Sequence, residues 1–366
     1  MRLKLVLTAL IGMTLLVALC PAASAVTTWY VNGANGSDGN NCRSAATACE
    51  TIKGVLSKPP VSGDSIRIAP AVYSENLTIN SNLKLIGASA RTTIIDGGHI
   101  RVISIGTSAH VTLANLTIRN GSAASGGGIL NFGSLTLSSS AITGNFAGSG
   151  TSAAGGGISS SGTLTVNNST FSGNTVSADP VRGVAAGGAI YATGPLVMNN
   201  STVSGNSETG HFLGGGGIYT AGAAIISNTT VAGNRGNSGG GIYKGGGTVI
   251  IQNSIVSSSS PGGNCFGTMT SHGYNLSSDG TCSFSNSGDL KKTDPQLIYP
   301  LSSNGGGTQT LALKSGSPAI DSGNPAGCKN NLGVVLKTDQ RGMPRPDKTD
   351  TVTPRCDRGA FELQGD

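Results

Sequence analysis

An eleven-residue unit recurs through the middle of the chain and limits the fold more strictly than any other feature of the sequence. Its four clearest copies are LTLSSSAITGN from Leu135, LTVNNSTFSGN from Leu164, LVMNNSTVSGN from Leu196 and AIISNTTVAGN from Ala224. Related segments begin at Val111 and Val249, so that successive units are 24 to 32 residues apart. Periods of this length are typical of solenoids, in which each repeat forms one coil that packs on its neighbours.

Each unit reads as an alternating strand, a short polar turn and a second short strand, followed by glycine, asparagine and a variable loop. A third strand begins at a Gly-Gly-x-Ile motif, in step with the first. Three short strands per coil predict an all-β chain folded as a single-stranded parallel β-helix. The isoleucines that centre the third strand are Ile129, Ile158, Ile190, Ile218 and Ile242.

Asparagine occupies the same corner of successive units, with Ser139 substituting once. Asparagine tolerates the left-handed backbone that a tight corner needs, and its amide can bond to the same amide one coil away. We therefore expect an inward structural ladder, which we prefer to the N-glycosylation that several of these sites also match. The ladder residues are Asn115, Asn168, Asn200, Asn228 and Asn253.

The repeats resemble those of pectin-lyase-type right-handed β-helices, and this resemblance implies the same handedness here. Gly-Gly-Ala-Ile at residues 187–190 and Phe-Ser-Gly-Asn at 171–174 are also similar to repeats of chlamydial polymorphic outer-membrane proteins. Both tetrapeptides are short, so they support a type of coil and not a function.

Residues 1–25 have the pattern of a cleavable secretory signal peptide, with Arg2 and Lys4 before an apolar run and Ala-Ser-Ala at its end. The run is short for a bilayer crossing, so we expect no membrane span after cleavage. Cys20 raises the alternative of a lipoprotein, but Leu19 is too bulky for the residue before a lipidated cysteine. We expect a bacterial protein that is secreted or displayed at the cell surface.

Residues 26–96 are expected to form an N-terminal cap and the first coils, and residues 97–288 the β-helix repeats. Within the first part, Ile52, Val55 and Leu56 are spaced as one face of a short helix. Such a helix would cover the open end of the first coil, which otherwise exposes strand backbone and apolar core.

Residues 289–366 are expected to form a separate C-terminal capping module. TDQRGMPRP from Thr338 and CDRGAFE from Cys356, with segments before them, resemble the choice-of-anchor Q domain of bacterial surface proteins. The resemblance implies a secreted or surface-displayed protein whose chemistry is undefined.

Six cysteines remain after signal cleavage, in a chain routed to an oxidising compartment. Among the fifteen possible sets of three pairs we prefer the one in which each bridge closes a short loop. The preferred pairs are Cys42 with Cys49, Cys265 with Cys282 and Cys328 with Cys356.

Charge and metal ligands are sparse. The net charge is +6, or +4 without Arg2 and Lys4, and there is no run of basic residues, so we expect no nucleic-acid partner. We expect no cofactor either. Calcium has weak support from Asp347, Asp350 and Asp357, which lack the glycine-spaced pattern of a calcium loop.

Acidic residues are too few in the coils to predict an inherited catalytic centre. Between residues 97 and 288 they are Asp179, Glu208 and Asp279, with no Asp-Asp pair or Asp-x-Asp on a strand. Polysaccharide-cleaving β-helices need carboxylates around the scissile bond, as an acid and base pair or as calcium ligands. We assign no catalytic residue and favour a protein that is not an enzyme.

Two groups of residues are candidate ligand-binding sites. Tyr191, Tyr219 and Tyr243 each follow the isoleucine of the third strand, so alternation places them outward, stacked from coil to coil. The stack is either a sugar-binding platform or a surface ladder that only steadies the solenoid. The second group lies on the variable loops. These residues form a cluster if the loops of successive coils align, and otherwise they are charged side chains in solvent. They are Asp179, Arg182, Glu208, His211 and Arg235.

The sequence therefore favours a non-catalytic structural or binding protein, with a polysaccharide or a cell-surface component as partner and an adhesive role as a variant. The alternative is a polysaccharide lyase or glycoside hydrolase that acts on an acidic polysaccharide. That alternative rests on the fold resemblance and the modest positive charge, and a fold by itself says little about function.

Overall fold

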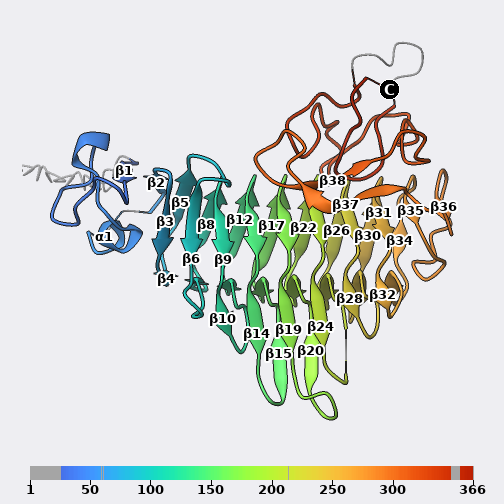
Figure 1. Ribbon diagram of the computed structural model, residues 1–366, viewed down its shortest axis with the longest axis horizontal. Helices are drawn as coiled ribbons and strands as arrows, with labels where there is room; N and C mark the ends of the chain where they lie inside the picture. Colours follow the sequence, from blue (N-terminus) through green and yellow to red (C-terminus); the bar gives the residue numbers. More distant parts are fainter. Residues whose placement is uncertain (1–25, 59, 61, 213, 348–354, 366) are drawn as a thin grey trace, which may run out of the picture.

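The computed structural model describes residues 26–58, 60, 62–212, 214–347 and 355–365. The expected signal peptide, residues 1–25, lies outside this part of the chain. The strands of successive coils stack in order into three long parallel sheets, here named A, B and C (Figure 1). The fold is the all-β parallel solenoid that the sequence predicts, with very little helix.

Sheet A contains the first strand of each coil. Its side chains alternate between the interior and solvent, so that inward residues such as Leu113, Leu137 and Val166 lie directly opposite one another and are fully buried. Its strands are β1 (Thr28–Val31), β2 (Asp64–Ile68), β5 (Leu83–Gly87), β8 (His110–Ala114), β12 (Ser134–Ser138), β17 (Thr163–Asn167), β22 (Leu196–Asn199), β26 (Ala224–Ser227), β30 (Val249–Gln252) and β34 (Thr270–Ser271).

Sheet B follows sheet A after a tight corner. In the repeats this corner is the column of five asparagines and Ser139, whose φ angles all lie between 46° (Ser139) and 56° (Asn115). Its strands are β3 (Ala71–Ser74), β6 (Thr93–Asp96), β9 (Thr117–Arg119), β13 (Ala141–Thr143), β18 (Thr170–Ser172), β23 (Thr202–Ser204), β27 (Thr230–Ala232), β31 (Ile255–Ser257), β35 (Leu276–Ser277) and β36 (Leu290–Lys291).

Sheet C closes each coil, and five of its strands begin at the isoleucines of the Gly-Gly-x-Ile motif. The three strands per coil therefore leave a narrow interior filled mainly by Ile, Leu and Val. The strands are β4 (Leu77–Ile79), β7 (Ile103–Ile105), β11 (Ile129–Asn131), β16 (Ile158–Ser160), β21 (Ile190–Ala192), β25 (Ile218–Thr220), β29 (Ile242–Lys244) and β33 (Cys265–Phe266).

A buried asparagine column lies in the Gly-Asn turn that follows sheet B, and the sequence interpretation missed it. Each side-chain amide donates to the Oδ1 atom of the next asparagine, at 2.9 Å from Asn145 to Asn174, 2.9 Å from Asn174 to Asn206 and 3.0 Å from Asn206 to Asn234. The four side chains are at most 2% exposed. This column is the fully inward ladder of the solenoid.

The variable loops form additional strands that project from the coils as a fin (Figure 1). Six of these strands form a further parallel sheet, here named D, and β15 and β20 form a separate pair. We call sheet D and this pair together the fin. Small residues fill the space between its two layers: Ala147, Ala153, Val176, Ala178 and Ala185. The strands are β10 (Ser122–Ala123), β14 (Phe146–Gly148), β19 (Thr175–Ser177), β24 (Ser207–Thr209), β28 (Arg235–Gly236) and β32 (Ser260–Pro261) in sheet D, with β15 (Ser152–Ala154) and β20 (Val184–Ala186).

The N-terminal part contains η1 (Ala45–Thr47) and α1 (Ile52–Leu56). The Thr51 hydroxyl accepts the N–H of Gly54, and the Glu75 carboxylate accepts those of Ile52 and Lys53, so the first turn of α1 is satisfied. The predicted helix is therefore present, although it is short. Its role as a cap over the first coil stays a prediction.

The C-terminal part contains the antiparallel hairpin of β37 (Leu297–Ser302) and β38 (Thr310–Leu313), which lies beside the coils (Figure 1). The C-terminal part packs against outward threonines of sheet B. The Thr170 hydroxyl donates to the carbonyl of Gln309, in the hairpin loop, at 2.6 Å. The Thr202 hydroxyl donates to the side chain of Gln340, beyond the hairpin, at 2.6 Å. These contacts run along the flank of the solenoid. A capping role for residues 289–366 stays a prediction.

All three expected disulfides are present: Cys42–Cys49, Cys265–Cys282 and Cys328–Cys356. Within the described residues, no helix is long and apolar enough to cross a membrane.

Candidate functional site

The outward tyrosines of sheet C form a continuous stack. The ring centroids of Tyr191 and Tyr219 are 5.0 Å apart and those of Tyr219 and Tyr243 5.2 Å apart, with interplanar angles of 16°. The column continues to Phe266, whose ring lies 4.5 Å from that of Tyr243 at 11°. The parallel register of sheet C places these four residues opposite one another. Tyr191 pairs with Tyr219, Tyr219 with Tyr243, and Tyr243 with Phe266.

We call these four residues the aromatic column. Its tyrosine faces cover one another, and Tyr219 is only 8% exposed, so the tyrosines present mainly ring edges and hydroxyl groups. Phe266 lies on the last strand of sheet C and is 48% exposed. It therefore offers an aromatic face that, in the part of the chain that the structure describes, no further strand of sheet C covers. The sequence interpretation missed Phe266 because Cys265 replaces the isoleucine of the motif, although Gly-Gly-x is retained at residues 262–264.

Of the charged loop residues, Glu208 and Arg235 line one cavity of about 370 Å³ at the fin. Pro180, Thr209 and Asn237 also line it. Asp179, Arg182 and His211 are not among its lining residues, so the structure brings together only part of the predicted cluster.

Glu208 is the most unusual acid of the fin. It pairs in register with Val176, is 2% exposed and points into the small-residue interior. Its Oε2 atom accepts the N–H of Asn237 at 3.0 Å, while its Oε1 atom has no hydrogen-bond partner among the described residues. Burial raises the pKa of Glu208 to about 7, although the Asn237 N–H opposes this shift.

Glycine makes room for the Glu208 carboxyl group. A Cβ atom at Gly210 would lie 3.2 Å from Oε1, and one at Gly236 would lie 3.4 Å from Oε2. Larger residues at either position would therefore crowd the carboxyl group.

The remaining loop residues have local roles or are solvated. The Asp179 carboxylate accepts the N–H groups of Val181 and Arg182, at 2.8 and 2.9 Å, and these bonds hold the pKa of Asp179 below its usual range. Arg182 is exposed, and the His211 ring meets the exposed Phe212 ring edge-on, 4.4 Å between centroids.

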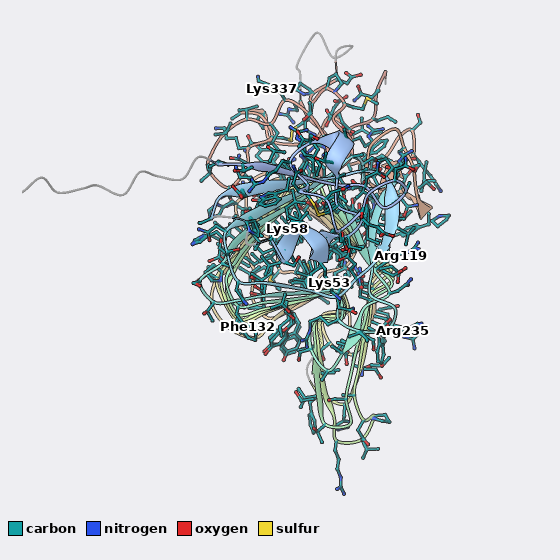
Figure 2. The ribbon with its side chains drawn as sticks, turned by 90° about the vertical axis from the view of Figure 1, so that its left-hand side faces the viewer. Lys53, Lys58, Arg119, Phe132, Arg235 and Lys337 are labelled. Carbon is teal, nitrogen blue, oxygen red and sulfur yellow. A yellow bond between two sulfur atoms is a disulfide. The ribbon has the colours of Figure 1, made fainter. Side chains whose placement is uncertain are left out.

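The aromatic column and the charged cavity belong to different surfaces. Phe132, directly after β11 of sheet C, and Arg235, in β28 of the fin, lie on opposite sides of the molecule (Figure 2). None of the three tyrosines lines the cavity with Glu208. The two predicted groups therefore do not form one combined site.

The corner asparagines bond to one another and to the C-terminal part. Two ladder bonds are present, from Asn200 to Asn168 at 2.8 Å and from Asn253 to Asn228 at 3.0 Å. The side-chain amide of Asn228, however, donates to the Lys329 carbonyl of the C-terminal part, at 2.8 Å. The column therefore contains ladder bonds at these two pairs, and at Asn228 it is also in contact with the C-terminal part. Asn115 completes the column.

The C-terminal motifs form a buried ionic network. Arg345 is 1% exposed; its Nε atom pairs with Glu362 at 2.8 Å and its Nη1 atom donates to Asn200 Oδ1 at 3.0 Å. Arg341 pairs with Asp339 at 2.7 Å. TDQRGMPRP and CDRGAFE therefore hold the C-terminal part together and fasten it to the corner asparagines.

No group of three potential metal ligands is assembled within the described ranges. Of the three candidate calcium ligands, Asp350 lies outside those ranges, and Asp347 accepts the N–H of Gly365 at 2.7 Å. The Asp357 carboxylate accepts the N–H groups of Asp321 and Leu363, at 2.9 and 2.7 Å.

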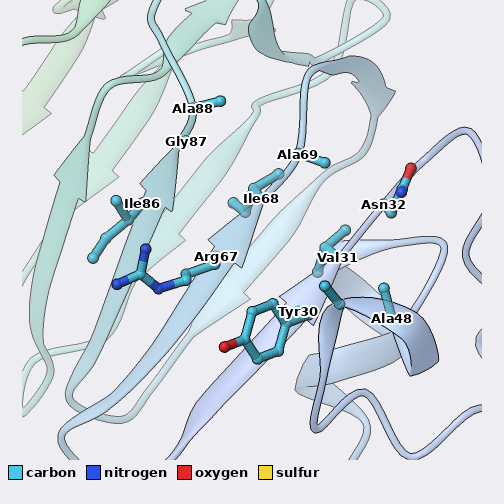
Figure 3. A pocket seen from close by; sticks show the side chains of 11 residues that line it. Tyr30, Val31, Asn32, Ala48, Arg67, Ile68, Ala69, Ile86, Gly87 and Ala88 are labelled. Atoms are coloured by element: carbon cyan, nitrogen blue, oxygen red, sulfur yellow. The ribbon is translucent and has the colours of Figure 1, made fainter.

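A further hollow of about 260 Å³ lies on the outer side of β1, β2 and β5 (Figure 3). Tyr30 and Arg67 pair across the first two of these strands, and Arg67 pairs with Ile86 on the third. The hollow is lined mostly by apolar atoms and belongs to sheet A, so it is separate from the aromatic column.

Comparison with known proteins agrees with the coil architecture. The family described as right handed beta helix region matches residues 101–287. The chain belongs to this family. Among solved structures, this β-helix protein is similar to pectin methylesterase PemA from Erwinia chrysanthemi, with 15% identity, a TM-score of 0.34 and coverage of 81% of this chain and 87% of that one. No curated protein matches the chain.

Proposed function

We propose that this β-helix protein is a secreted or cell-surface scaffold that binds polysaccharide without cleaving it. The observation that carries the proposal is the aromatic column, which ends in the exposed ring of Phe266. The apolar face of a pyranose ring packs well on an aromatic face, and hydroxyl groups beside that face orient the sugar. Phe266 is the stacking platform, and the edges of Tyr191 and Tyr243 provide hydroxyl groups along the sheet.

An extracellular setting is supported by three disulfides, which persist in oxidising compartments. The similarity of the C-terminal motifs to the choice-of-anchor Q domain supports display at a bacterial surface. The similarity of the coils to chlamydial polymorphic proteins supports an adhesive variant of the same role, in which the bound glycan belongs to another cell.

The two ends of the solenoid have protective roles in this proposal. The segment around α1 covers the first coil, and the described residues of the segment 289–366 stabilise the later coils through their contacts along sheet B. An unprotected solenoid end or flank would expose apolar core and invite aggregation.

Affinity electrophoresis in gels that contain pectin, alginate, xylan or a β-glucan tests the proposal. We expect at least one polymer to retard the wild type, and Phe266→Ala to lose most of that retardation because the stacking face is gone. Phe146→Ala is the matched control, since Phe146 is 42% exposed on β14 of the fin. Equal retardation of wild type and Phe266→Ala, or none on any polymer, overturns the proposal.

Glu208 favours the alternative, a polysaccharide lyase or glycoside hydrolase. A carboxyl group with a pKa of about 7 can exchange a proton near neutral pH, and Arg235 beside the same cavity suits an acidic substrate. Unsaturated or reducing-end products from acidic polymers, lost in Glu208→Gln, support an enzyme. Turnover that Glu208→Gln retains excludes this acid.

A further inference from the structure

A groove runs along the outer side of sheet B, beside the C-terminal hairpin. It consists of two adjoining cavities of about 380 and 290 Å³ that share Ser172 and Gln309. Neither cavity includes a residue of the aromatic column or of the fin cavity with Glu208. It is therefore a separate surface.

The floor of the groove is a column of polar side chains in register. Arg119 pairs with Thr143 across β9 and β13, Thr143 with Ser172 on β18, and Ser172 with Ser204 on β23. The Ser172 hydroxyl donates to the Thr143 hydroxyl at 3.1 Å. At the adjacent turn, Gly205 leaves the backbone open, since a Cβ atom there would meet nothing within 4 Å.

The hairpin supplies the opposite wall. Tyr299 on β37 is 46% exposed, and its ring lies over Gly233, where an added Cβ atom would be 3.1 Å from Cε1. Tyr299 and Leu301 line one cavity, and Gln309 lines both. A bound chain would therefore meet an aromatic ring at one end and hydroxyl and amide groups along its length.

Positive charge is concentrated at the other end. Arg91 and Arg119 line the larger cavity, and no carboxylate is among the described residues that line either one. Arg119 is paired through its Nε atom with Asp96, at 2.8 Å, and its side chain is 37% exposed. Within the described residues its two Nη groups make no hydrogen bond, so they are available to a ligand, and a planar guanidinium suits a carboxylate or sulfate group.

The wall is held rigidly against the floor. The side-chain amide of Gln340 donates to the hydroxyls of Thr170 and Thr308, at 2.8 and 2.9 Å, and all three residues are at most 5% exposed. The groove is consequently formed before any ligand arrives, so that binding does not have to order it.

We propose that this groove binds a segment of an acidic polysaccharide, with its carboxylate or sulfate groups at Arg119 and a sugar ring on Tyr299. The groove spans six strands of sheet B, from β6 to β27, which corresponds to about 24 Å at the usual strand spacing. This length accommodates several sugar units. A peptide is a poorer occupant because the backbone groups of these interior strands already pair with neighbours on both sides.

Isothermal titration with tetramers of galacturonate and of alginate, against a neutral cello-tetramer, tests the site. We expect an acidic tetramer to bind and the neutral one to bind more weakly. Thr143→Trp fills the groove and should weaken binding about tenfold or more, and Arg119→Gln about fivefold. Thr165→Trp is the matched control, at a half-buried outward position on β17 of sheet A.

The variants separate this site from the aromatic column. Thr143→Trp should weaken binding of the acidic tetramer more than Phe266→Ala does, and Phe266→Ala should weaken retardation by whole polymers more than Thr143→Trp does. The inference is overturned if no acidic tetramer binds, if Thr143→Trp binds as tightly as Thr165→Trp, or if polyglutamate of similar length binds as well as the sugar. The last result would show that charge alone decides binding.

Discussion

Substitution of Glu208 by glutamine should make the fin more stable at alkaline pH. The usual pKa of this side chain is 4.5, and burial raises it to about 7 in the closed fin. When the fin opens, the carboxyl group reaches water and its pKa returns to the usual value. Closing the fin therefore favours the protonated form.

The sign of the pH dependence follows from this difference. Below pH 4.5 the carboxyl group is protonated in both states and has no effect on the equilibrium. Between pH 4.5 and about 7 the open fin releases a proton that the closed fin keeps, so the stability of the closed fin falls as the pH rises. Above pH 7 the loss is complete.

The magnitude can be worked from the same shift. About 2.5 pKa units correspond to roughly 3 kcal/mol, and solvent in the adjoining cavity screens the carboxylate, so we expect about half of that. A glutamine side chain at this position would be neutral at every pH and could still accept the Asn237 N–H. At pH 8 the glutamine variant should therefore close the fin more tightly by about 1.5 kcal/mol.

Native-state hydrogen exchange of the amides of β24 (Ser207–Thr209) measures this local equilibrium. At pH 8 these amides should exchange about tenfold more slowly in Glu208→Gln than in the wild type, and at pH 4.5 the two should agree. Glu50→Gln, at an exposed position, is the matched control. If the ratio of the wild-type exchange rate to the Glu208→Gln exchange rate is the same at both pH values, Glu208 is not held protonated by the fin.

Three further predictions concern the scaffold. Arg345→Met should leave the Glu362 carboxylate buried without its cation and cost about 3 kcal/mol, seen as proteolysis of residues 294–347 while the β signal in circular dichroism persists. Asn174→Ala should remove two inter-coil bonds of the buried column and cost about 3 kcal/mol, seen as a lower thermal midpoint. Tyr219→Ala should open a gap in the aromatic column and cost about 2 kcal/mol in the same melt, whether or not a glycan binds.

The coils were readable from the sequence because each one repeats the same local rules. Alternation in LTLSSSAITGN sets the strand and its inward face, and asparagine at the corner adopts the left-handed backbone that ends it. The three disulfides were also predictable, since each joins cysteines that are close in sequence. These features depend on contacts within one coil or between adjacent coils.

The candidate sites were less predictable because they depend on which surfaces distant segments share. The tyrosines were found by alternation, but Phe266 joins them through the strand pairing of a coil in which Cys265 replaces the isoleucine of the motif. The variable loops read as solvated, and the structure instead folds them into a two-layered fin that buries Glu208. No local pattern marks a loop carboxylate as buried.

The sequence by itself determined the parallel coil, its corner asparagines and its local disulfides, since periodic polarity and turn chemistry act over a few residues. Only the tertiary structure decided the environment of those asparagines, because residues 294–347 and 355–365 lie along the flank and bond to them. The same return of the chain builds the wall of the sheet B groove, through bonds such as that between Thr170 and Gln309, 139 residues apart. Contacts between residues so far apart in the chain produce no periodic sequence pattern. The coil could therefore be predicted from the sequence, and the groove could not.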